Sequence, residues 1–215
     1  MVTPLTLLHT SPVHVPVFDA LRDRNHPGAV LRHLVVPELL DRARAEGPQS
    51  VAPELRKLLE GAGGPVLVTC SSIGGTAEGL AADTGVPVLR ADRPMAAAAV
   101  RGGSGSGGRT RIVVLATVES TVGPTRELLA EEGAGRSVEI RTHLVAGAWD
   151  RFGAGDIAGS HRLVAQAADA VTDADVIVLA QGSMAGATEL VTTRIPILTS
   201  QASGLAAGLE LLEGV

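Results

Sequence analysis

The feature that most constrains this chain is a regular alternation of short apolar runs with longer segments rich in Ala, Leu, Arg and Glu. The short runs predict β-strands, and the longer segments, such as residues 15–22, 53–60, 125–132 and 157–171, are typical of helices. This alternation predicts an α/β fold with helices packed on parallel sheets. The strands are expected at residues 5–8, 31–36, 66–69, 86–89, 111–116, 138–144, 176–180 and 195–198.

The composition fits this class and argues against nucleic-acid binding. Of the 215 residues, 45% are hydrophobic but only 1% are aromatic, so the core must be built from aliphatic side chains. Such a core suits helices on a parallel sheet. The net charge of -5 and the scarcity of aromatic rings are wrong for a surface that binds phosphates and stacks bases. We therefore expect no nucleic-acid partner.

The sequence also predicts a protein without a membrane partner. No apolar run approaches the roughly 20 residues that cross a bilayer, and the residues from Met1 to Leu5 do not begin a signal peptide. The single cysteine cannot form an internal disulfide and is too few for a cysteine-rich zinc site. A lone thiol is best preserved in a reducing compartment, so we expect a cytoplasmic protein with no metal site.

A segment of glycine and serine, residues 102–108, divides the chain. It contains the spacing G-x-G-x-x-G at Gly103, Gly105 and Gly108, but a dinucleotide-binding loop follows a strand and begins a helix. Here the glycines follow a predicted helix and precede a predicted strand, so the segment is interpreted as a linker. The expected domains are an N-terminal lobe of residues 1–101 plus 203–215, the linker 102–108, and a C-terminal lobe of residues 109–202.

The two halves resemble each other at three places. The residues around Cys70 align with those around Gln181 at an offset of 111 (181 − 70). Residues 86–88 align with 195–197 at an offset of 109, and residues 7–10 align with 114–117 at an offset of 107. Three matches in the same order indicate a duplicated fold, although aliphatic strands also resemble one another by chance. Pseudo-twofold symmetry would make the strand ends of the two lobes face each other across one cleft.

Small polar residues follow most of the predicted strands. Ligands of open parallel sheets bind beyond the carboxyl ends of the strands, where helix N-termini present N–H groups. Hydroxyl, amide and N–H groups can hold a carboxylate without a lysine or arginine. We therefore expect a small carboxylate substrate, bound by residues at the strand ends, namely His9, Thr10, Ser71, Ser72, Thr117, Ser120, Thr121 and Gly182.

Cys70 is the candidate reactive group. It follows the apolar run 66–69 and precedes Ser-Ser-Ile-Gly-Gly, which predicts a helix beginning close to the thiol. A nearby helix N-terminus can lower the pKa of a thiol toward neutrality, and such a thiol can transfer protons or act as a nucleophile. The alternative is a buried structural cysteine. The strand-end position favours the functional interpretation.

At these residues the chain resembles the aspartate/glutamate racemase superfamily, which includes hydantoin racemases, maleate isomerases and arylmalonate decarboxylases. The resemblance spans the whole chain and rests on residues 69–74, 90–95 and 178–184. It implies two pseudo-symmetric lobes, each a parallel-sheet βα sandwich, with the active site in the cleft between them. It also implies catalysis without metal or organic cofactor, and a homodimer. In the racemases, two cysteines flank the substrate: one removes the proton next to a carboxylate, and the other returns a proton on the opposite face.

The chain departs from this pattern at the second cysteine. Cys70 matches the first one, whereas Gln181 occupies the second position, and an amide cannot replace a thiol as a base. Ser183 lies two residues further on, but an unactivated hydroxyl is a poor base. The resemblance makes Cys70, Gln181 and Ser183 the predicted catalytic positions, with Cys70 as the acid/base that transfers a proton at the carbon next to a carboxylate.

Several alternatives stay open from the sequence. Arylmalonate decarboxylases keep one cysteine, on the other lobe, so a one-cysteine decarboxylase or cis-trans isomerase of the same fold is an alternative reaction. A non-catalytic protein that binds small carboxylates is another. His143 or His161 would be the source of a different second base. Asp92 is expected to cap a helix that begins at Pro94.

Overall fold

The chain, as a computed structural model, is described over residues 3–102 and 108–213. Its contacts divide it into unit 1, Met1–Arg93 with Gln201–Val215, and unit 2, Pro94–Ser200. The sequence-based boundaries put residues 94–101 in the N-terminal lobe, whereas the contacts group them with unit 2. The reason is that helix α6 (Arg93–Arg101) packs its buried side chains into the core of unit 2. Most of the predicted linker, residues 103–107, lies outside the described residues.

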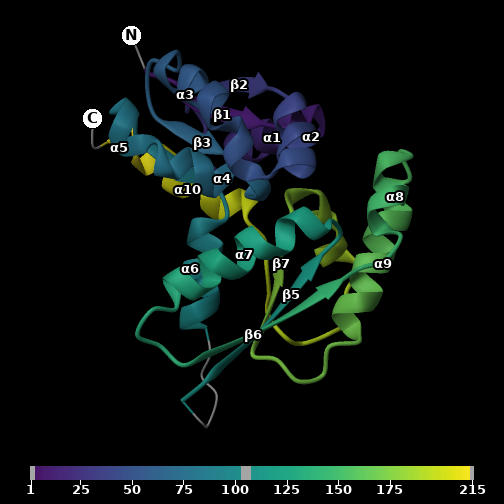
Figure 1. Ribbon diagram of the computed structural model, residues 1–215. Helices are drawn as coiled ribbons and strands as arrows, with labels where there is room; N and C mark the ends of the chain where they lie inside the picture. Colours follow the sequence, from purple (N-terminus) through teal and green to yellow (C-terminus); the bar gives the residue numbers. More distant parts are fainter. Residues whose placement is uncertain (1–2, 103–107, 214–215) are drawn as a thin grey trace. The chain divides into compact units, whose positions relative to one another are not determined.

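Unit 1 is built on a parallel sheet with the strand order β2-β1-β3-β4. Its strands are β1 (Leu5–His9), β2 (Leu31–Val35), β3 (Val66–Val68) and β4 (Val88–Arg90). Its helices are η1 (Pro12–His14), α1 (Val15–Asn25), α2 (Glu38–Glu46), η2 (Pro48–Val51), α3 (Ala52–Glu60), α4 (Ser71–Gly79), α5 (Ala81–Thr84) and α10 (Gln201–Glu210). Phe18 and Leu205 bring α1 and α10 onto one face of the sheet, and Leu39, Leu55 and Ile73 bring α2, α3 and α4 onto the other. Figure 1 shows helices of unit 1 around its strands.

Unit 2 repeats this plan with the strand order β6-β5-β7-β8. Its strands are β5 (Thr110–Ala116), β6 (Val138–Leu144), β7 (Val176–Leu179) and β8 (Ile197–Leu198). Besides α6, its helices are α7 (Glu119–Glu132), α8 (Ala148–Gly153), α9 (Ile157–Asp169) and η3 (Gly182–Glu189). α6 and α7 pack on one face of the sheet, and α8, α9 and η3 pack on the other. All eight predicted strands are present, and the predicted α/β fold with two parallel sheets is confirmed.

The two sheets agree in register as well as in strand order. Leu7 pairs with Leu67 in unit 1, and Val114 pairs with Val178 in unit 2. These pairs reproduce the sequence offsets of 107 (114 − 7) and 111 (178 − 67). The third strand pairs with the fourth in the same manner, at offsets of 111 and 109, through Val66↔Val88 and Ile177↔Ile197. The internal alignment read from the sequence therefore corresponds to equivalent positions in the two sheets.

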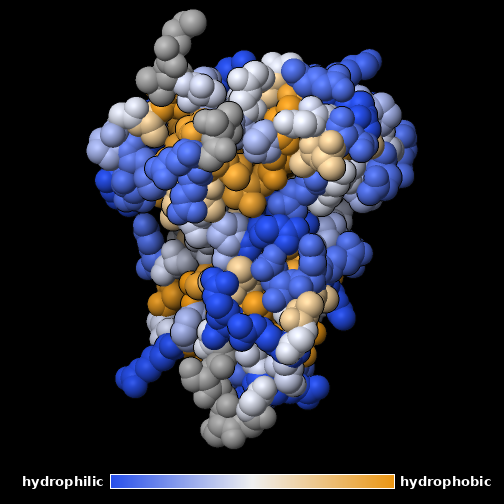
Figure 2. Space-filling view, turned by 90° about the vertical axis from the view of Figure 1, so that its left-hand side faces the viewer, coloured by the Kyte–Doolittle hydropathy of each residue, from blue (hydrophilic) through white to orange (hydrophobic). Residues whose placement is uncertain are grey.

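Hydrophilic side chains cover much of the face shown in Figure 2, with apolar side chains between them. Several large aliphatic residues are exposed, including Val13, Val17, Val30, Val35, Leu144, Ile157 and Leu190. Exposed aliphatic side chains are common on globular proteins. Across residues 3–102 and 108–213, no helix combines the length and apolar character needed to span a bilayer.

Candidate active site

Cys70 lies between β3 and α4, at the carboxyl end of a central strand of unit 1. Its backbone is extended, with φ −105° and ψ 114°, and its carbonyl accepts the N–H of Gly74 at 3.0 Å. Cys70 is therefore the N-cap residue of α4, which begins directly after it. The residue is half-buried, packs against the core formed with α2, α3 and α4, and is not in a disulfide. The predicted position at a strand end and a helix start is confirmed.

Burial raises the pKa of the Cys70 thiol above its ordinary value. The Thr10 side chain and the N–H groups of Ser72 and Ile73 act in the opposite direction, and the Asp92 carboxylate adds a smaller raising effect. The expected lowering of the pKa is therefore wrong, because loss of hydration of the thiolate outweighs the favourable groups around it. A thiol with a raised pKa is protonated at neutral pH and is suited to donate a proton.

A buried ion pair supports the start of α4. Arg90 Nε lies 2.6 Å from Asp92 Oδ1, Arg90 Nη2 lies 2.9 Å from Asp92 Oδ2, and the two side chains are only 5% and 3% exposed. Arg90 Nη2 also lies 3.5 Å from the carbonyl oxygen of Ser71. A Cβ atom at Gly74 would lie 2.9 Å from Arg90 Cβ, so glycine is needed for this close approach of α4. Asp92 precedes α6, as expected of a cap, but its carboxylate forms this ion pair.

His9, predicted to bind substrate, is fully buried. Its Nδ1 lies 2.7 Å from Thr69 Oγ1, and its Nε2 lies 2.8 Å from His33 Nδ1. Both ring nitrogens therefore have protein partners, which fits a positioning role better than contact with a substrate. Burial, with His33 and His14 nearby, lowers the pKa of His9 from 6.5 to about 3.

The lowered pKa of His9 predicts a loss of stability in acid. Between pH 6.5 and about 3 the unfolded state binds a proton at His9 that the folded state does not. The free energy of unfolding should therefore fall as the pH drops through this window, at up to about 1.4 kcal/mol per pH unit. Urea titrations at several pH values should show that the free energy of unfolding depends less steeply on pH in His9→Ala than in the wild type. Gln166→Ala, an exposed change that removes no titrating group, is the control and should keep the wild-type slope; an unchanged slope in His9→Ala would contradict the prediction.

Gln181 occupies the position of unit 2 that is equivalent to Cys70. It is the N-cap residue of η3, with extended backbone at φ −131° and ψ 141°. Its Oε1 accepts the backbone N–H of Thr117 at 2.6 Å and the Thr117 hydroxyl at 3.0 Å. A backbone N–H can only donate, so the atom facing it must be the amide oxygen. The amide nitrogen has no hydrogen-bond partner among the described residues, and Gln181 therefore offers N–H donors rather than a base.

Each unit contains, within itself, the same contact between two equivalent positions. In unit 1 the residue after the first strand, Thr10, interacts with Cys70 after the third strand. In unit 2 the corresponding Thr117 binds Gln181. Thr10 and Thr117 are each 8% exposed. In each unit a buried threonine thus positions the residue that caps the following helix.

The first turn of α7 carries two of the other predicted binding residues. Val118 caps α7 without a side-chain hydrogen bond, so the first N–H groups of the helix receive no cap from it. The Ser120 hydroxyl oxygen is buried without a partner among the described residues, and Thr121 is 3% exposed. The free N–H groups at a helix N-terminus are suited to hold an anion.

Ser183 and His161 are joined through the backbone of η3. His161 Nε2 lies 3.0 Å from the Ser183 carbonyl oxygen, so this nitrogen donates. A Cβ atom at Gly186 would clash with His161 Cε1, and glycine is therefore required where the ring packs on η3. These contacts indicate that His161 supports the loop that carries Gln181, Gly182 and Ser183.

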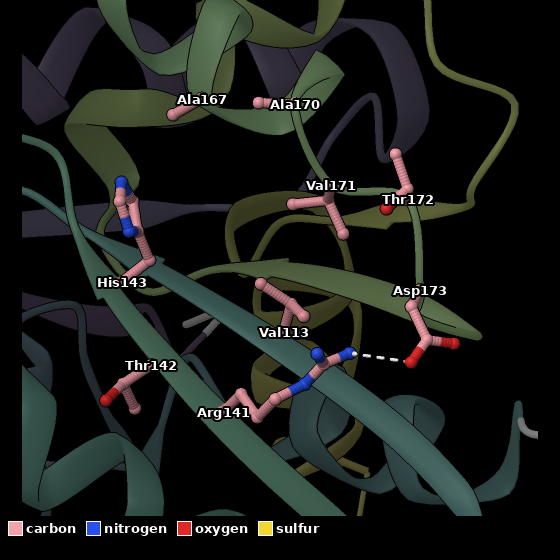
Figure 3. A pocket seen from close by; sticks show the side chains of 9 residues that line it. All are labelled: Val113, Arg141, Thr142, His143, Ala167, Ala170, Val171, Thr172 and Asp173. Carbon is pink, nitrogen blue, oxygen red and sulfur yellow. Dashed lines mark ion pairs between the residues drawn. The ribbon is translucent and has the colours of Figure 1, made fainter.

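His143, the other candidate second base, lines a separate pocket of about 330 Å³ in unit 2 (Figure 3). The pocket lies between β5, β6 and the end of α9, and includes none of the predicted site residues. Its Arg141 lies 3.8 Å from Asp173 and 3.9 Å from Glu139, so its charge is compensated within unit 2. In the part of the chain that is described, no three His, Cys, Asp or Glu side chains are grouped so that they could hold a metal ion.

The partners of His9 were not predictable as site residues from the sequence. His33, which the sequence did not single out, binds His9, and its Nε2 lies 3.4 Å from Asp19 Oδ1. Thr69 was quoted only as part of the resemblance. The signal in the sequence was a histidine in each of two short predicted strands. The contacts among His9, His33 and Thr69 depend on the pairing of β1 with β2 and β3, which the sequence does not show.

Comparison of the sequence with protein-family models finds no match, and comparison with curated proteins finds none either. Solved structures share its fold. A glutamate racemase isoform of Bacillus anthracis has a TM-score of 0.72 and 17% identity, covering 99% of this chain and 82% of that one. The aspartate racemase of Picrophilus torridus has a TM-score of 0.67 and 14% identity, covering 98% and 94%. A liganded arylmalonate decarboxylase, with one glycine replaced by cysteine and one cysteine by serine, has a TM-score of 0.59 and 21% identity, covering 99% and 94%. The fold expected from the resemblance is confirmed.

Proposed function

We propose that this protein, which has the fold of the aspartate/glutamate racemase superfamily, is a cofactor-independent enzyme that transfers a proton at the carbon next to a carboxylate. The observation that carries the proposal is the pair of equivalent strand-end residues. Cys70, held by Thr10, is an ionisable thiol at a helix start, and Gln181, held by Thr117, offers amide donors. Similar structures include racemases and a decarboxylase.

Each predicted residue receives a role in this proposal. Cys70 is the acid/base. Gln181 and the start of α7 bind the carboxylate and the negative charge that develops beside the reacting carbon, which is the electrostatic contribution that usually dominates such reactions. The other residues of this binding group are Ser71, Ser72, Ser120, Thr121, Gly182 and Ser183. His9 has a positioning role, because it holds Thr69.

Proton transfer on one face is favoured over two-base racemisation. Gln181 has no proton-transfer pKa, and Cys70, as a protonated thiol, is set up to donate. In the decarboxylase version, the bond to a second carboxylate breaks, carbon dioxide leaves, and the electron pair stays on the α-carbon as an enediolate. The Cys70 S–H proton then goes to that carbon, and solvent reprotonates the thiolate. The single cysteine and the likeness to arylmalonate decarboxylase favour this second candidate.

Incubation with small acids in D₂O tests the proposal. The panel contains α-amino, α-hydroxy and α-aryl acids and 2-substituted malonates, followed by proton NMR, chiral chromatography and carbon dioxide release. We expect deuterium on one face of the α-carbon, with carbon dioxide release from malonates if the reaction is decarboxylation. Formation of both enantiomers would contradict one-sided transfer. Tight carboxylate binding without exchange or release would identify a binding protein instead.

Gln181→Glu isolates the donor role of the amide. The carboxylate can still accept both Thr117 hydrogen bonds, but it presents a negative oxygen where the wild type presents N–H donors. We expect the affinity for a carboxylate ligand to fall about tenfold or more, since hydrogen bonds to charged groups are the stronger ones. Isothermal titration calorimetry measures this. Gln166→Glu adds the same charge at an exposed position of α9 and should change the affinity little; equal effects of the two variants would contradict the prediction.

The resemblance also implies a homodimer, which we retain as part of the proposal. Light scattering coupled to size-exclusion chromatography would give a mass close to twice 21.9 kDa for a dimer. A mass near that of one chain would contradict it.

A further inference from the structure

A line of hydrogen-bonded side chains runs from the surface of unit 1 to the residue before Cys70. Asp19 Oδ1 lies 3.4 Å from His33 Nε2, His33 Nδ1 lies 2.8 Å from His9 Nε2, and His9 Nδ1 lies 2.7 Å from Thr69 Oγ1. Asp19 is 37% exposed, His33 is 15% exposed, and His9 is fully buried. We call these four residues the relay. Its elements are α1, β2, β1 and the end of β3.

The hydrogen-bond capacities of these groups give the relay one direction. The Asp19 carboxylate, which also pairs with Arg22 at 2.9 Å, can only accept, so His33 donates from Nε2. The other nitrogen of a neutral imidazole accepts, so His33 Nδ1 receives the N–H of His9 Nε2. His9 Nδ1 in turn accepts the Thr69 hydroxyl. Every donor in the relay therefore points toward Asp19.

The Thr69 hydroxyl is available for this bond. The hydroxyl can instead donate to the Leu8 carbonyl, 3.1 Å away, but that carbonyl already accepts the backbone N–H of Thr69 at 3.0 Å. Donation to His9 therefore leaves no backbone group unsatisfied. In the opposite direction the Thr69 hydroxyl donates to the Leu8 carbonyl and both rings donate from Nδ1, so a singly protonated His33 turns a lone pair at Nε2 toward the Asp19 carboxylate. That arrangement is repulsive.

Unit 2 shows that the fold does not require these polar residues. The offsets of 107 and 111 place Ala116 at the position of His9 and Ala180 at the position of Thr69, and both alanines are buried. Unit 2 nevertheless keeps the contact between Thr117 and Gln181. Burying a histidine removes its hydration, which is unfavourable. The unit with the thiol nevertheless has a histidine at this position, whereas the other unit has an alanine.

We propose that His9, His33 and Asp19 are positioning residues for Cys70. The relay ties the end of β1 to the end of β3, and the next residue of each is a member of the thiol site, Thr10 on one side and Cys70 on the other. By fixing these two strand ends, it holds the Thr10 side chain where it stabilises the thiolate. Its consequence for catalysis rests on the proposed function; its effect on the thiol does not.

Nitrogen-15 NMR of the histidine rings tests the direction of the relay in the intact protein. We expect the protons of both rings to be found on Nε2. The His9→Ala and His33→Phe variants assign the two signals among the six histidines. A proton on Nδ1 of either ring would overturn the proposed direction, and this result needs no substrate.

The pH dependence of Cys70 alkylation by iodoacetamide tests the positioning effect. His33→Phe removes both nitrogens, and we expect the midpoint to rise by about half a pH unit, so that alkylation below the midpoint slows about threefold. His33→Gln keeps one acceptor and one donor and should recover much of the wild-type midpoint. Asp19→Ala removes the terminal acceptor and should raise the midpoint in the same direction. Asp23→Ala is its matched control, because Asp23 also pairs with Arg22 but does not contact His33.

Asp19→Ala keeps the test decisive if His33→Phe does not fold, because Asp19 is partly exposed. Wild-type midpoints in both variants, or an equal rise in Asp23→Ala, would overturn the proposal. Alkylation and tautomers are measured without a substrate, so a protein with the expected relay and no reaction with any acid would reject the proposed enzyme but retain the relay.

Discussion

Replacing Asp92 with alanine is expected to lower the free energy of unfolding by about 3–5 kcal/mol. Asp92 and Arg90 form a two-point ion pair in which both side chains are at most 5% exposed. Without the carboxylate, the guanidinium stays buried without its closest counter-charge, because Glu78 is engaged by Arg93 at 2.7 Å. Removing one partner of a buried pair is much more destabilising than removing both. Asp92→Ala combined with Arg90→Met should therefore be more stable than Asp92→Ala alone.

Urea unfolding of matched variants measures this effect. Asp83→Ala removes the partner of Arg56 from an exposed pair of 2.8 Å and should cost no more than about 1 kcal/mol. Similar losses in Asp92→Ala and Asp83→Ala would contradict the prediction. A second readout concerns the thiol: because Asp92 raises the pKa of Cys70, Asp92→Ala should lower the midpoint of Cys70 alkylation.

The sequence predicted the strands better than the helix boundaries. Each strand is a short aliphatic run between polar segments, and β6 has the predicted bounds. α7 begins at Glu119 and runs through Pro124, whereas the sequence suggested a start at residue 125, after the proline. The expected lobe boundary came from the composition of the linker, whereas the contacts of α6 group it with unit 2. The buried face of α6 packs against β5 and β7, and this packing depends on the tertiary structure rather than on the local sequence.

The position of the thiol was predictable, but its electrostatics was not. A strand followed by Ser-Ser-Ile-Gly-Gly indicates a helix start next to Cys70, and the structure has one. The pKa of the thiol depends on a balance between burial and a few N–H and O–H groups, and that balance is set by packing from α2, α3 and Thr10. The sequence supplied only the helix N-terminus, which lowers the pKa, and therefore gave the opposite sign.

The internal repeat carried more information than any single motif. The offsets identified Gln181 as the counterpart of Cys70, and the strand registers agree with them. They also pair Thr10 with Thr117, which explains why a hydroxyl recurs after the first strand of each unit. At these equivalent positions the units differ in the cap residue and in the presence of the polar relay, which unit 1 has and unit 2 lacks. Unit 1 thus carries a thiol at this cap and unit 2 an amide, so only one of the two equivalent positions can transfer a proton.

Cys70→Ser is expected to slow the proton-transfer reaction by about 10²–10⁴-fold, the usual contribution of a general acid or base. A serine hydroxyl fits the same space but does not ionise in the working pH range. The urea midpoint should change little, because the side chain is half-buried and nearly the same size. Deuterium exchange into the best acid of the panel measures the rate, and Cys70→Ala should lose as much. In the wild type, deuteration of a decarboxylation product, which needs only the protonated thiol, should decline as the pH rises through the raised pKa of Cys70. A wild-type exchange rate in Cys70→Ser would show that Cys70 is not the acid/base, whereas a loss confined to Cys70→Ala would show that a hydroxyl can replace the thiol as a hydrogen-bond donor.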